Sequence, residues 1–311
     1  MIDPAFAADV RASLQKSPRQ LPSKYLYDEL GSALFEAICR LPWYRITRAE
    51  SSLLARHARE ILAPLTRPLS LAELGCGSGE KLALLVRHAT EPLQLIQLID
   101  ISPSALDTAR YRLEALGIRA ILTHHTTYED GIGRAAASRP RDGSLLVLFL
   151  GSNIGNFDPR VAGNLLRRVR LALREGDALL LGSDLVKPEE ELLLAYDDPL
   201  HVTEAFNRNV LRRINDELGG TFDLAGYDHL AIWNAEASRV EMHLVARERQ
   251  HVRIPAAGVE LTLEAGERIW TEMSHKYERS QVLADGLAAG FAAAEQWVDE
   301  AAGFALTRFV V

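Results

Sequence analysis

Cysteine is scarce in this chain, because Cys39 and Cys76 are the only two among 311 residues. Two cysteines exclude a disulfide framework and argue against a structural zinc site. Long apolar runs are missing too, since no stretch approaches the roughly 18 residues of a membrane span. The N-terminal sequence MIDPAFAADV has acids where a signal peptide has a basic region followed by an apolar core. We therefore expect a protein that stays in the cytoplasm.

An excess of basic charge is also lacking. Lys and Arg number 35 against 42 Asp and Glu, so the net charge is -7 and the sequence pI is about 5.8. This balance gives no electrostatic reason to expect nucleic acid or an anionic membrane as a partner. We expect a small-molecule partner, and a monomer is compatible with the sequence. No metal centre is expected, because the candidate histidines share no ligand spacing on one element: His124, His125, His201, His243, His251 and His275.

What the chain does have is a glycine-rich stretch, ELGCGSGEK, over residues 73–81. It follows the apolar run 69–74 and precedes an apolar segment compatible with a helix, an order that predicts a strand, a tight turn and a helix. Gly75, Gly77 and Gly79 allow a sharp turn and a close approach to a ligand, because a Cβ would crowd that space or forbid a positive φ. A flat or extended ligand could therefore lie on this loop.

Two acids indicate which ligand the loop binds. Asp100 ends the next apolar strand, LIQLID, and a carboxylate there suits the two hydroxyls of a ribose. NAD and S-adenosylmethionine both fit this arrangement, and the glycines could also serve only a tight connection. Glu73, however, stands where a dinucleotide enzyme places pyrophosphate, and a carboxylate repels phosphate but attracts a sulfonium or an ammonium group. The sequence therefore favours S-adenosylmethionine, with Glu73, Gly75, Gly77 and Asp100 at its site.

Strand and helix patterns alternate through the middle of the chain, which predicts an α/β fold with a parallel, doubly wound sheet. Two extended segments near the C-terminus, 292–298 and 304–311, should close this sheet as an antiparallel pair, the way class I (Rossmann-like) methyltransferases end. A loop is expected between the third and fourth strands, and its residues 126–130 could reach an adenine ring or simply be solvated. The expected strands are 69–74, 94–100, 119–123, 145–150 and 178–185, and the expected helices are 48–62, 80–89, 103–116 and 159–173.

After Lys187 and Pro188 the pattern changes to two helices, 189–196 and 202–218, followed by closely spaced alternating strands. These strands predict an antiparallel sheet with short turns, in an α+β substrate domain inserted late in the first domain. We expect residues 50–186 and 278–311 to form the S-adenosylmethionine domain. Residues 1–49 and 187–277 should form the substrate domain.

Several polar residues are candidates for substrate binding. Asn156, in GSNIGNFDP just past the fourth strand, has an amide that suits an amino acid, or it could only bond its own turn. Asp158 should cap the following helix. Glu272 and Ser274 alternate onto one face of a strand, where they could bind an imidazole if buried, or could simply be exposed. Tyr27 and Tyr44 fall outside the apolar helical stripe and could either pack half-buried or touch a ligand.

An ordered set of motifs resembles the L-histidine-specific N-alpha-methyltransferases of ergothioneine biosynthesis. The resemblance runs from about residue 21 to residue 276. Each motif alone is weak, but the set in this order is specific. The motifs are KYLYDELGSALFEAICRLPWYRITRAE, ELGCGSGEK, FLGSNIGNFDP, LLLGSDLVKP with AYDD, AFNRNVL, RVEMHLVARERQHVRI and TEMSHK.

The resemblance implies roles for individual residues, with histidine held between the two domains. Asn156 and Tyr196 would hold the substrate carboxylate, and Tyr27 would lie near the α-amine. Tyr44, Glu272 and Ser274 would face the imidazole, with Met242 lining that pocket. The acid at position 272 favours histidine, because relatives that methylate tryptophan derivatives lack it. The cofactor would be surrounded by Gly75, Lys81, Asp100, Tyr128 and Gly151.

Three positions depart from the family pattern. Ser78 and Gly79 replace the usual Thr-Ser pair, which affects the details of cofactor hydrogen bonding, and Arg45 replaces a second tyrosine. The implied reaction is an in-line transfer of up to three methyl groups from S-adenosylmethionine to the α-amine of L-histidine, which gives hercynine. Tyr27 would act on the amine proton, and no metal is needed. The alternatives are an N-methyltransferase of another aromatic amino acid, such as tryptophan, and a non-catalytic amino-acid sensor.

Overall fold

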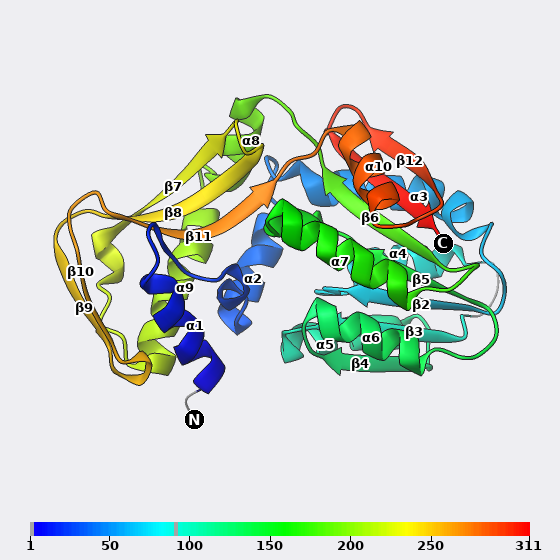
Figure 1. Cartoon of the computed structure of the whole chain (residues 1–311), viewed down its shortest axis with the longest axis horizontal. Coiled ribbons are helices and arrows are strands. Elements are labelled where there is room, and N and C mark those ends of the chain that lie inside the picture. Colours follow the sequence, from blue (N-terminus) through cyan, green and yellow to red (C-terminus); the bar gives the residue numbers. More distant parts are fainter. Residues whose placement is uncertain (1–2, 90–92) are drawn as a thin grey trace. The chain divides into compact units, whose positions relative to one another are not determined.

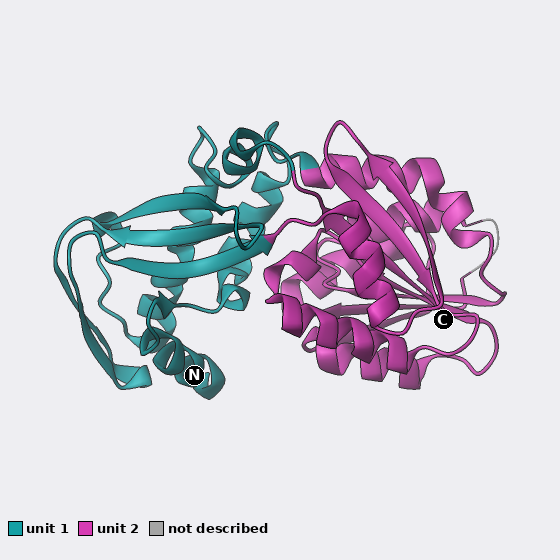
Figure 2. Ribbon diagram, turned by 45° about the horizontal axis from the view of Figure 1, so that its top comes forward, with its two compact units in different colours: residues 1–45, 187–274 teal, residues 46–186, 275–311 magenta. Residues whose placement is uncertain are grey.

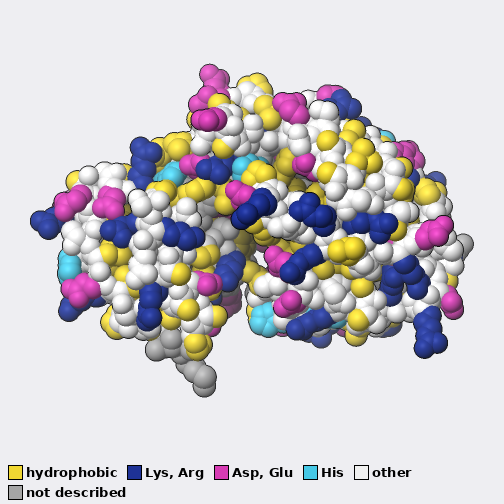
Figure 3. All heavy atoms as spheres, viewed as in Figure 1, with side chains coloured by type: hydrophobic (Ala, Val, Ile, Leu, Met, Phe, Trp, Pro, Cys, Tyr) yellow, Lys and Arg dark blue, Asp and Glu magenta, His cyan; other side chains and the backbone are white. Residues whose placement is uncertain are grey.

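A computed structural model describes residues 3–89 and 93–311. The chain forms two compact units, shown in different colours in Figure 2. Unit 1 comprises Met1–Arg45 and Lys187–Ser274, and unit 2 comprises Ile46–Val186 and His275–Val311. Each unit is therefore built from two separate stretches of the sequence. On the face of the molecule drawn in Figure 3, basic and acidic side chains are interspersed.

The described residues of unit 2 form a seven-stranded sheet with the order β12-β13-β6-β5-β2-β3-β4 (Figure 1). Neighbouring strands from β6 to β4 are parallel, and β13 runs antiparallel to both β6 and β12. The predicted class I methyltransferase fold, including its closing antiparallel pair, is confirmed. The strands are β2 (Leu69–Leu74), β3 (Leu95–Asp100), β4 (Ile121–His125), β5 (Ser144–Phe149), β6 (Ala178–Asp184), β12 (Ala293–Asp299) and β13 (Phe304–Val310).

Helices cover both faces of this sheet, which is why central strands such as β2 and β5 are buried along their whole length. Leu181 belongs to the apolar core that β6 shares with α6, α7 and α10. The next residue, Gly182, points to the opposite face, toward α3. Helix α5 packs against both α4 and β3. The helices are α3 (Arg45–Leu62), α4 (Glu80–His88), α5 (Pro103–Ala115), α6 (Tyr128–Ser138), α7 (Pro159–Ala172) and α10 (Arg279–Ala288).

The expected loop between the third and fourth strands is wrong, because most of it is the helix α6. The sequence signal is weak there, since Gly131 and Gly133 lower helix propensity and few apolar residues mark the buried face. Tertiary packing compensates: Ile132 and Ala135 join the core. A Cβ at Gly131 would lie 2.3 Å from Ile99, so this glycine is what lets α6 approach β3. The third strand also begins at Ile121 rather than at residue 119.

Unit 1 departs from the expected single antiparallel sheet. Its described strands form a four-stranded sheet, β1-β11-β8-β7, and a separate pair, β10-β9. The strand β1 pairs in parallel with β11, where Arg19 lies opposite Ile269. A strand of two residues has no periodicity, so the sequence could not indicate it. The strands are β1 (Arg19–Gln20), β7 (Tyr227–Asn234), β8 (Arg239–Ala246), β9 (Gln250–Ile254), β10 (Val259–Leu263) and β11 (Arg268–His275).

In unit 1 the helix α9 packs against α2 and against the strands β7 and β8. One anchor of this packing is Asp28, which caps α2 by accepting from the Gly31 N–H at 2.7 Å. The same carboxylate accepts from Asn209 at 2.7 Å and from Arg212 at 2.5 Å, both on α9. The helices are α1 (Pro4–Leu14), α2 (Glu29–Ile38), α8 (Glu189–Tyr196) and α9 (Val202–Leu218), and the last two confirm the predicted bounds.

Candidate active site

The glycine loop of unit 2 has the predicted conformation, with φ of +75° at Gly75, +48° at Gly77 and +70° at Gly79. A Cβ at Gly75 would lie 2.9 Å from the Tyr128 hydroxyl, and one at Gly79 would lie 2.9 Å from Ala109 Cβ. These two glycines therefore serve close packing within the protein. A Cβ at Gly77 would meet nothing within 4 Å. Gly77 is thus the position where the backbone turns toward open space and a ligand can approach.

Asp100, at the end of β3, forms a hydrogen bond to the glycine loop. Its carboxylate accepts from the Gly77 N–H at 3.0 Å and from the Ser102 N–H at 2.9 Å. Burial raises the pKa of Asp100, and these two backbone donors act in the opposite direction. A carboxylate offers about four lone-pair sites, so acceptor capacity remains for ribose hydroxyls.

Glu73 is almost fully buried, at 2% exposure, and its Oε2 atom has no hydrogen-bond partner among the described residues. Burial raises the pKa of Glu73 to about 8, with Lys81 acting to lower it and Glu50 and Asp100 acting to raise it further. A bound cation would favour the ionised form of this carboxyl. Its chemistry therefore fits the cationic groups of S-adenosylmethionine and does not fit a pyrophosphate.

Sequence reasoning missed Glu50, which lies on α3 and is 0% exposed. Both of its carboxylate oxygens lie 2.9 Å from the Gly151 N–H, and Lys81 Nζ lies 2.5 Å from Oε2. A Cβ at Gly182 would lie 2.0 Å from Oε1, so the glycine on β6 makes room for the buried acid. One signal was available: Glu50 stands within the apolar stripe of α3, next to Ala49 and four residues after Ile46.

The segment after β5 holds the remaining predicted residues of unit 2. Gly151 has φ +76°, and a Cβ there would lie 3.0 Å from Lys81 Nζ. Half-buried Asn156 ends the short 3-10 helix η2 (Asn153–Asn156). Asp158 caps α7 by accepting from the Arg160 N–H at 3.0 Å, as predicted. The half-buried Tyr128 packs edge-on against Phe149 at 5.1 Å between ring centroids.

Unit 1 brings five aromatic side chains into one group, which we call the aromatic cluster. Tyr27 lies edge-on to Phe35 at 5.4 Å and to Phe206 at 5.3 Å between ring centroids. Tyr44 lies 6.2 Å from Phe35 and 6.4 Å from Tyr196. Three residues singled out from the sequence, Tyr27, Tyr44 and Tyr196, therefore belong to a single group of rings.

One member of the aromatic cluster, Tyr196, also makes a buried hydrogen bond. The Tyr196 hydroxyl donates to Ser274 Oγ at 2.8 Å, and both side chains are buried. Glu272 is 8% exposed and Ser274 is 5% exposed, so the alternative of an exposed strand face is wrong for both. Met242, predicted to line the same pocket, is buried on β8, and its carbonyl accepts from Thr271 at 2.9 Å. Arg45, which departs from the family pattern, forms a surface ion pair with Glu191 at 3.0 Å.

A family model described as histidine-specific methyltransferase, SAM-dependent, matches residues 6–311. The chain belongs to this family. It is 40% identical to histidine N-alpha-methyltransferase of Mycolicibacterium smegmatis, over 98% of this chain and 95% of that protein. It is 39% identical to the protein of the same name from Mycobacterium tuberculosis, over 97% and 94%. It is also 27% identical to ergothioneine biosynthesis protein 1 of Neurospora crassa, over 82% of this chain and 31% of that protein.

Family membership agrees with the choice of S-adenosylmethionine over NAD and with an enzyme rather than a sensor. Within residues 3–89 and 93–311, no group of three or more His, Cys, Asp and Glu side chains is placed to hold a metal ion. No helix in this described part of the chain is both long and apolar enough to span a membrane.

We expect Asp100→Ala to weaken S-adenosylmethionine binding, because the ribose hydroxyls lose a charged acceptor and the loop loses its bond to the Gly77 N–H. The expected loss is roughly 1 to 3 kcal/mol in binding free energy, measured by titration calorimetry. Asp107→Ala, an exposed acid on α5, is the matched control and should leave the affinity unchanged. Wild-type affinity in the Asp100 variant would remove this residue from the site.

Proposed function

We propose that the protein transfers methyl groups from S-adenosylmethionine to the α-amine of L-histidine, up to three times, to give hercynine for ergothioneine biosynthesis. The family description and the names of the relatives that are about 40% identical over nearly the whole chain support this proposal. The structural observation that carries it is the burial of both Glu272 and Ser274 on β11, with Ser274 accepting from Tyr196 of the aromatic cluster. Buried polar groups of this kind suit a side chain that hydrogen-bonds, as imidazole does.

In this proposal unit 1 recognises the side chain of the substrate. Glu272 accepts from an imidazole N–H, and Ser274, oriented by the Tyr196 hydroxyl, bonds the other ring nitrogen. Tyr44 and Met242 supply the apolar surface around the ring. Because a carboxylate accepts hydrogen bonds only, it selects a substrate with an N–H at that position. The assignment of Asn156 and Tyr196 to the substrate carboxylate stays a prediction.

Unit 2 holds the methyl donor in this proposal. Asp100 binds the ribose, Lys81 attracts the carboxylate of the methionine part, and Glu73 faces its cationic groups. Gly77 lets the ligand approach the backbone. The remaining cofactor-site residues pack closely around the ligand in this proposal. They are Gly75, Gly151 and Tyr128. When bound, S-adenosylmethionine supplies an electrophilic methyl group, so the protein needs no covalent catalysis of its own.

The chemical task left to the chain is to present a neutral amine lone pair in line with the methyl group. Most of the acceleration then comes from positioning rather than from acid–base chemistry. Tyr27, held between Phe35 and Phe206, orients the amine through its hydroxyl. Each transfer forms an N–C bond and breaks the S–CH₃ bond, so that the donor leaves as its neutral thioether. The methylated ammonium must then lose a proton and rebind in the same place before the next transfer.

The test is incubation with S-adenosylmethionine and each of the twenty amino acids, followed by mass spectrometry. We expect mono-, di- and trimethylated products from histidine and none from the other amino acids. Methylation of tryptophan in place of histidine would replace the proposed substrate. Calorimetric binding of histidine without any methylated product would indicate a sensor and would refute the proposed reaction.

A further inference from the structure

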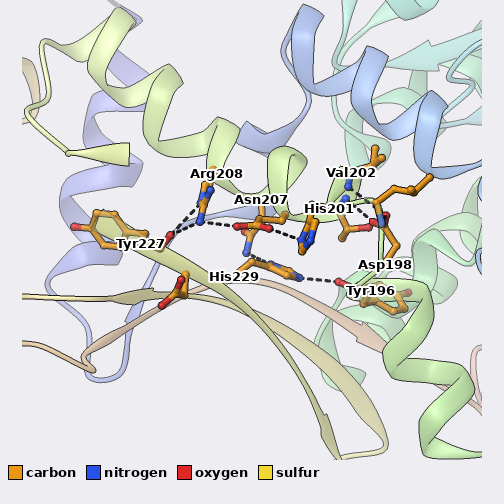
Figure 4. A network of polar contacts seen from close by, with 12 residues as sticks. Tyr196, Asp198, His201, Val202, Asn207, Arg208, Tyr227 and His229 are labelled. Carbon is orange, nitrogen blue, oxygen red and sulfur yellow. Dashed lines mark hydrogen bonds and ion pairs between the residues drawn. The ribbon is translucent and has the colours of Figure 1, made fainter. Parts of the chain in front are cut away.

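A chain of hydrogen bonds joins Asn207, His229 and Tyr196 in unit 1 (Figure 4). His229, on β7, has its Nε2 atom 2.8 Å from the Tyr196 carbonyl oxygen. Its Nδ1 atom lies 2.9 Å from Nδ2 of Asn207, a fully buried residue on α9. The same Asn207 nitrogen donates to the His243 carbonyl on β8 at 3.1 Å. The chain thus runs from α9 through β7 to the last residue of α8.

These contacts determine which ring nitrogen of His229 carries the proton. The His243 carbonyl can only accept, so the NH₂ group of Asn207 must face it. The second hydrogen of that NH₂ group then points at Nδ1 of His229, which must accept. A neutral imidazole with an acceptor at Nδ1 carries its hydrogen on Nε2. That hydrogen is donated to the Tyr196 carbonyl.

The Tyr196 carbonyl is one of those at the C-terminal end of α8, which have no partner within the helix. The bond from His229 satisfies it and fixes the end of the helix that carries the Tyr196 ring. The hydroxyl of that ring in turn donates to Ser274 Oγ at 2.8 Å. The directions of the bonds from Asn207 to the Tyr196 carbonyl therefore follow one from the other, and the Tyr196 side chain makes its own bond to Ser274.

The surroundings favour a neutral His229. Burial is the largest influence and lowers the pKa of His229, and the Arg208 guanidinium acts in the same direction. The Tyr196 carbonyl and the carboxylates of Asp197 and Glu204 act to raise the pKa.

Asn207 also keeps a buried Oδ1 atom that has no hydrogen-bond partner in the described structure. The amide therefore holds this orientation for its two donor contacts alone.

We propose that Asn207 and His229 are positioning residues that hold Tyr196 and Ser274 in the orientation that binds the amino-acid substrate. The proposal rests on the proposed function, since it concerns the same site. In this proposal His229 is neutral and carries its hydrogen on Nε2, the form that makes both hydrogen bonds. Losing either bond frees the end of α8, so substrate binding should weaken while S-adenosylmethionine binding, which depends on unit 2, should not.

The kinetic test compares His229→Leu, His229→Gln and Asn207→Leu with wild type. We expect the two leucine variants to raise KM for histidine by about tenfold, as for loss of one buried hydrogen bond. KM for S-adenosylmethionine should stay within about twofold. His229→Gln, whose amide can donate to the Tyr196 carbonyl and accept from Asn207, should recover most of the affinity. His251→Leu, an exposed histidine on β9, is the matched control.

A second measurement does not depend on the substrate. Nitrogen-15 NMR of the wild-type protein at pH 7 should show His229 as the neutral form protonated on Nε2. Asn207→Asp places an acceptor opposite Nδ1 and should raise the pKa of His229. The proposal is overturned if His229 is protonated, or carries its hydrogen on Nδ1, at pH 7. Equal rises in both KM values, or no recovery with glutamine, would also overturn it.

The experiments can refute the proposed function without refuting the positioning role of Asn207 and His229. If the wild-type protein methylates a different amino acid, the proposed substrate is wrong, and the same KM comparison is made with that acceptor. If it methylates none, the proposed reaction is wrong. The positioning role would then still be supported by two results. NMR would show the His229 hydrogen on Nε2, and calorimetry would show histidine binding weakened about tenfold in His229→Leu and recovered in His229→Gln.

Discussion

Glu272→Ala should lower kcat/KM for histidine by roughly 10⁴-fold, because the imidazole N–H loses its charged acceptor inside a buried site. A site built around a hydrogen bond rejects a ligand that leaves a polar group unpaired, and here the unpaired group would be on the substrate. The measurement is the steady-state rate over a range of histidine concentrations at saturating S-adenosylmethionine. Glu264→Ala, which removes an exposed carboxylate directly after β10, should leave the rate unchanged.

The same substitution combined with Met242→Val should shift specificity. Removing the carboxylate and the thioether leaves apolar room, so larger aromatic amino acids such as tryptophan should gain relative to histidine. The quantity to measure is the ratio of kcat/KM for histidine to that for tryptophan in wild type and double variant. A ratio that does not fall would mean that Glu272 does not face the substrate, and the assignment of the imidazole to unit 1 would lose its support.

Lys81→Met should destabilise the protein by about 3 to 5 kcal/mol, because it leaves the fully buried Glu50 carboxylate without its cation. Such a loss is a large share of the roughly 5 to 15 kcal/mol by which a typical domain is stable. Denaturant unfolding measures it, and calorimetry should show that S-adenosylmethionine binding is lost as well. Removing the exposed cation of Lys16 by Lys16→Met is the control and should change neither quantity.

A double variant separates the charge from the packing. Glu50→Gln together with Lys81→Met removes both charges and keeps an oxygen that can accept from the Gly151 N–H. Most of the lost stability should return, because the cost in the single variant arises from an unpaired buried charge. Cofactor affinity should not return, since Lys81 is still missing. A double variant as unstable as Lys81→Met would show that the lysine acts through packing and not through its charge.

Local patterns predicted most of unit 2 because the relevant interactions are close together in the sequence. Strands buried on both faces read as continuous apolar runs, as in LSLAEL and LLVLFL, and helices between them repeat every three to four residues. The glycine loop was equally visible, since a positive φ at Gly75, Gly77 and Gly79 is a requirement of the local backbone. Asp100 was found because it ends a strand at a fixed distance from that loop.

Local patterns failed where a distant partner sets the structure. The helix α6 has weak propensity and forms because Gly131 packs against Ile99 on a neighbouring strand. The strand β1 exists only because β11 lies beside it, and its two residues have no period of their own. The division of the unit 1 strands into two sheets is likewise set by pairing between strands and not by a local pattern.

By itself the sequence determined the Rossmann-like sheet, its closing antiparallel pair and the conformation of the glycine loop, because each rests on residue types at short fixed spacings. It also indicated the family, through an ordered set of motifs spread from about residue 21 to residue 276. Only the tertiary structure decided which polar residues are buried and with what partners. The apolar stripe of α3 hints that Glu50 is buried, but only the fold shows that Lys81 and Gly151 are its partners. His229 resembles any strand histidine until Asn207 and the Tyr196 carbonyl assign its proton. The energy of a buried polar group depends on neighbours far away in the sequence, and no local pattern records them.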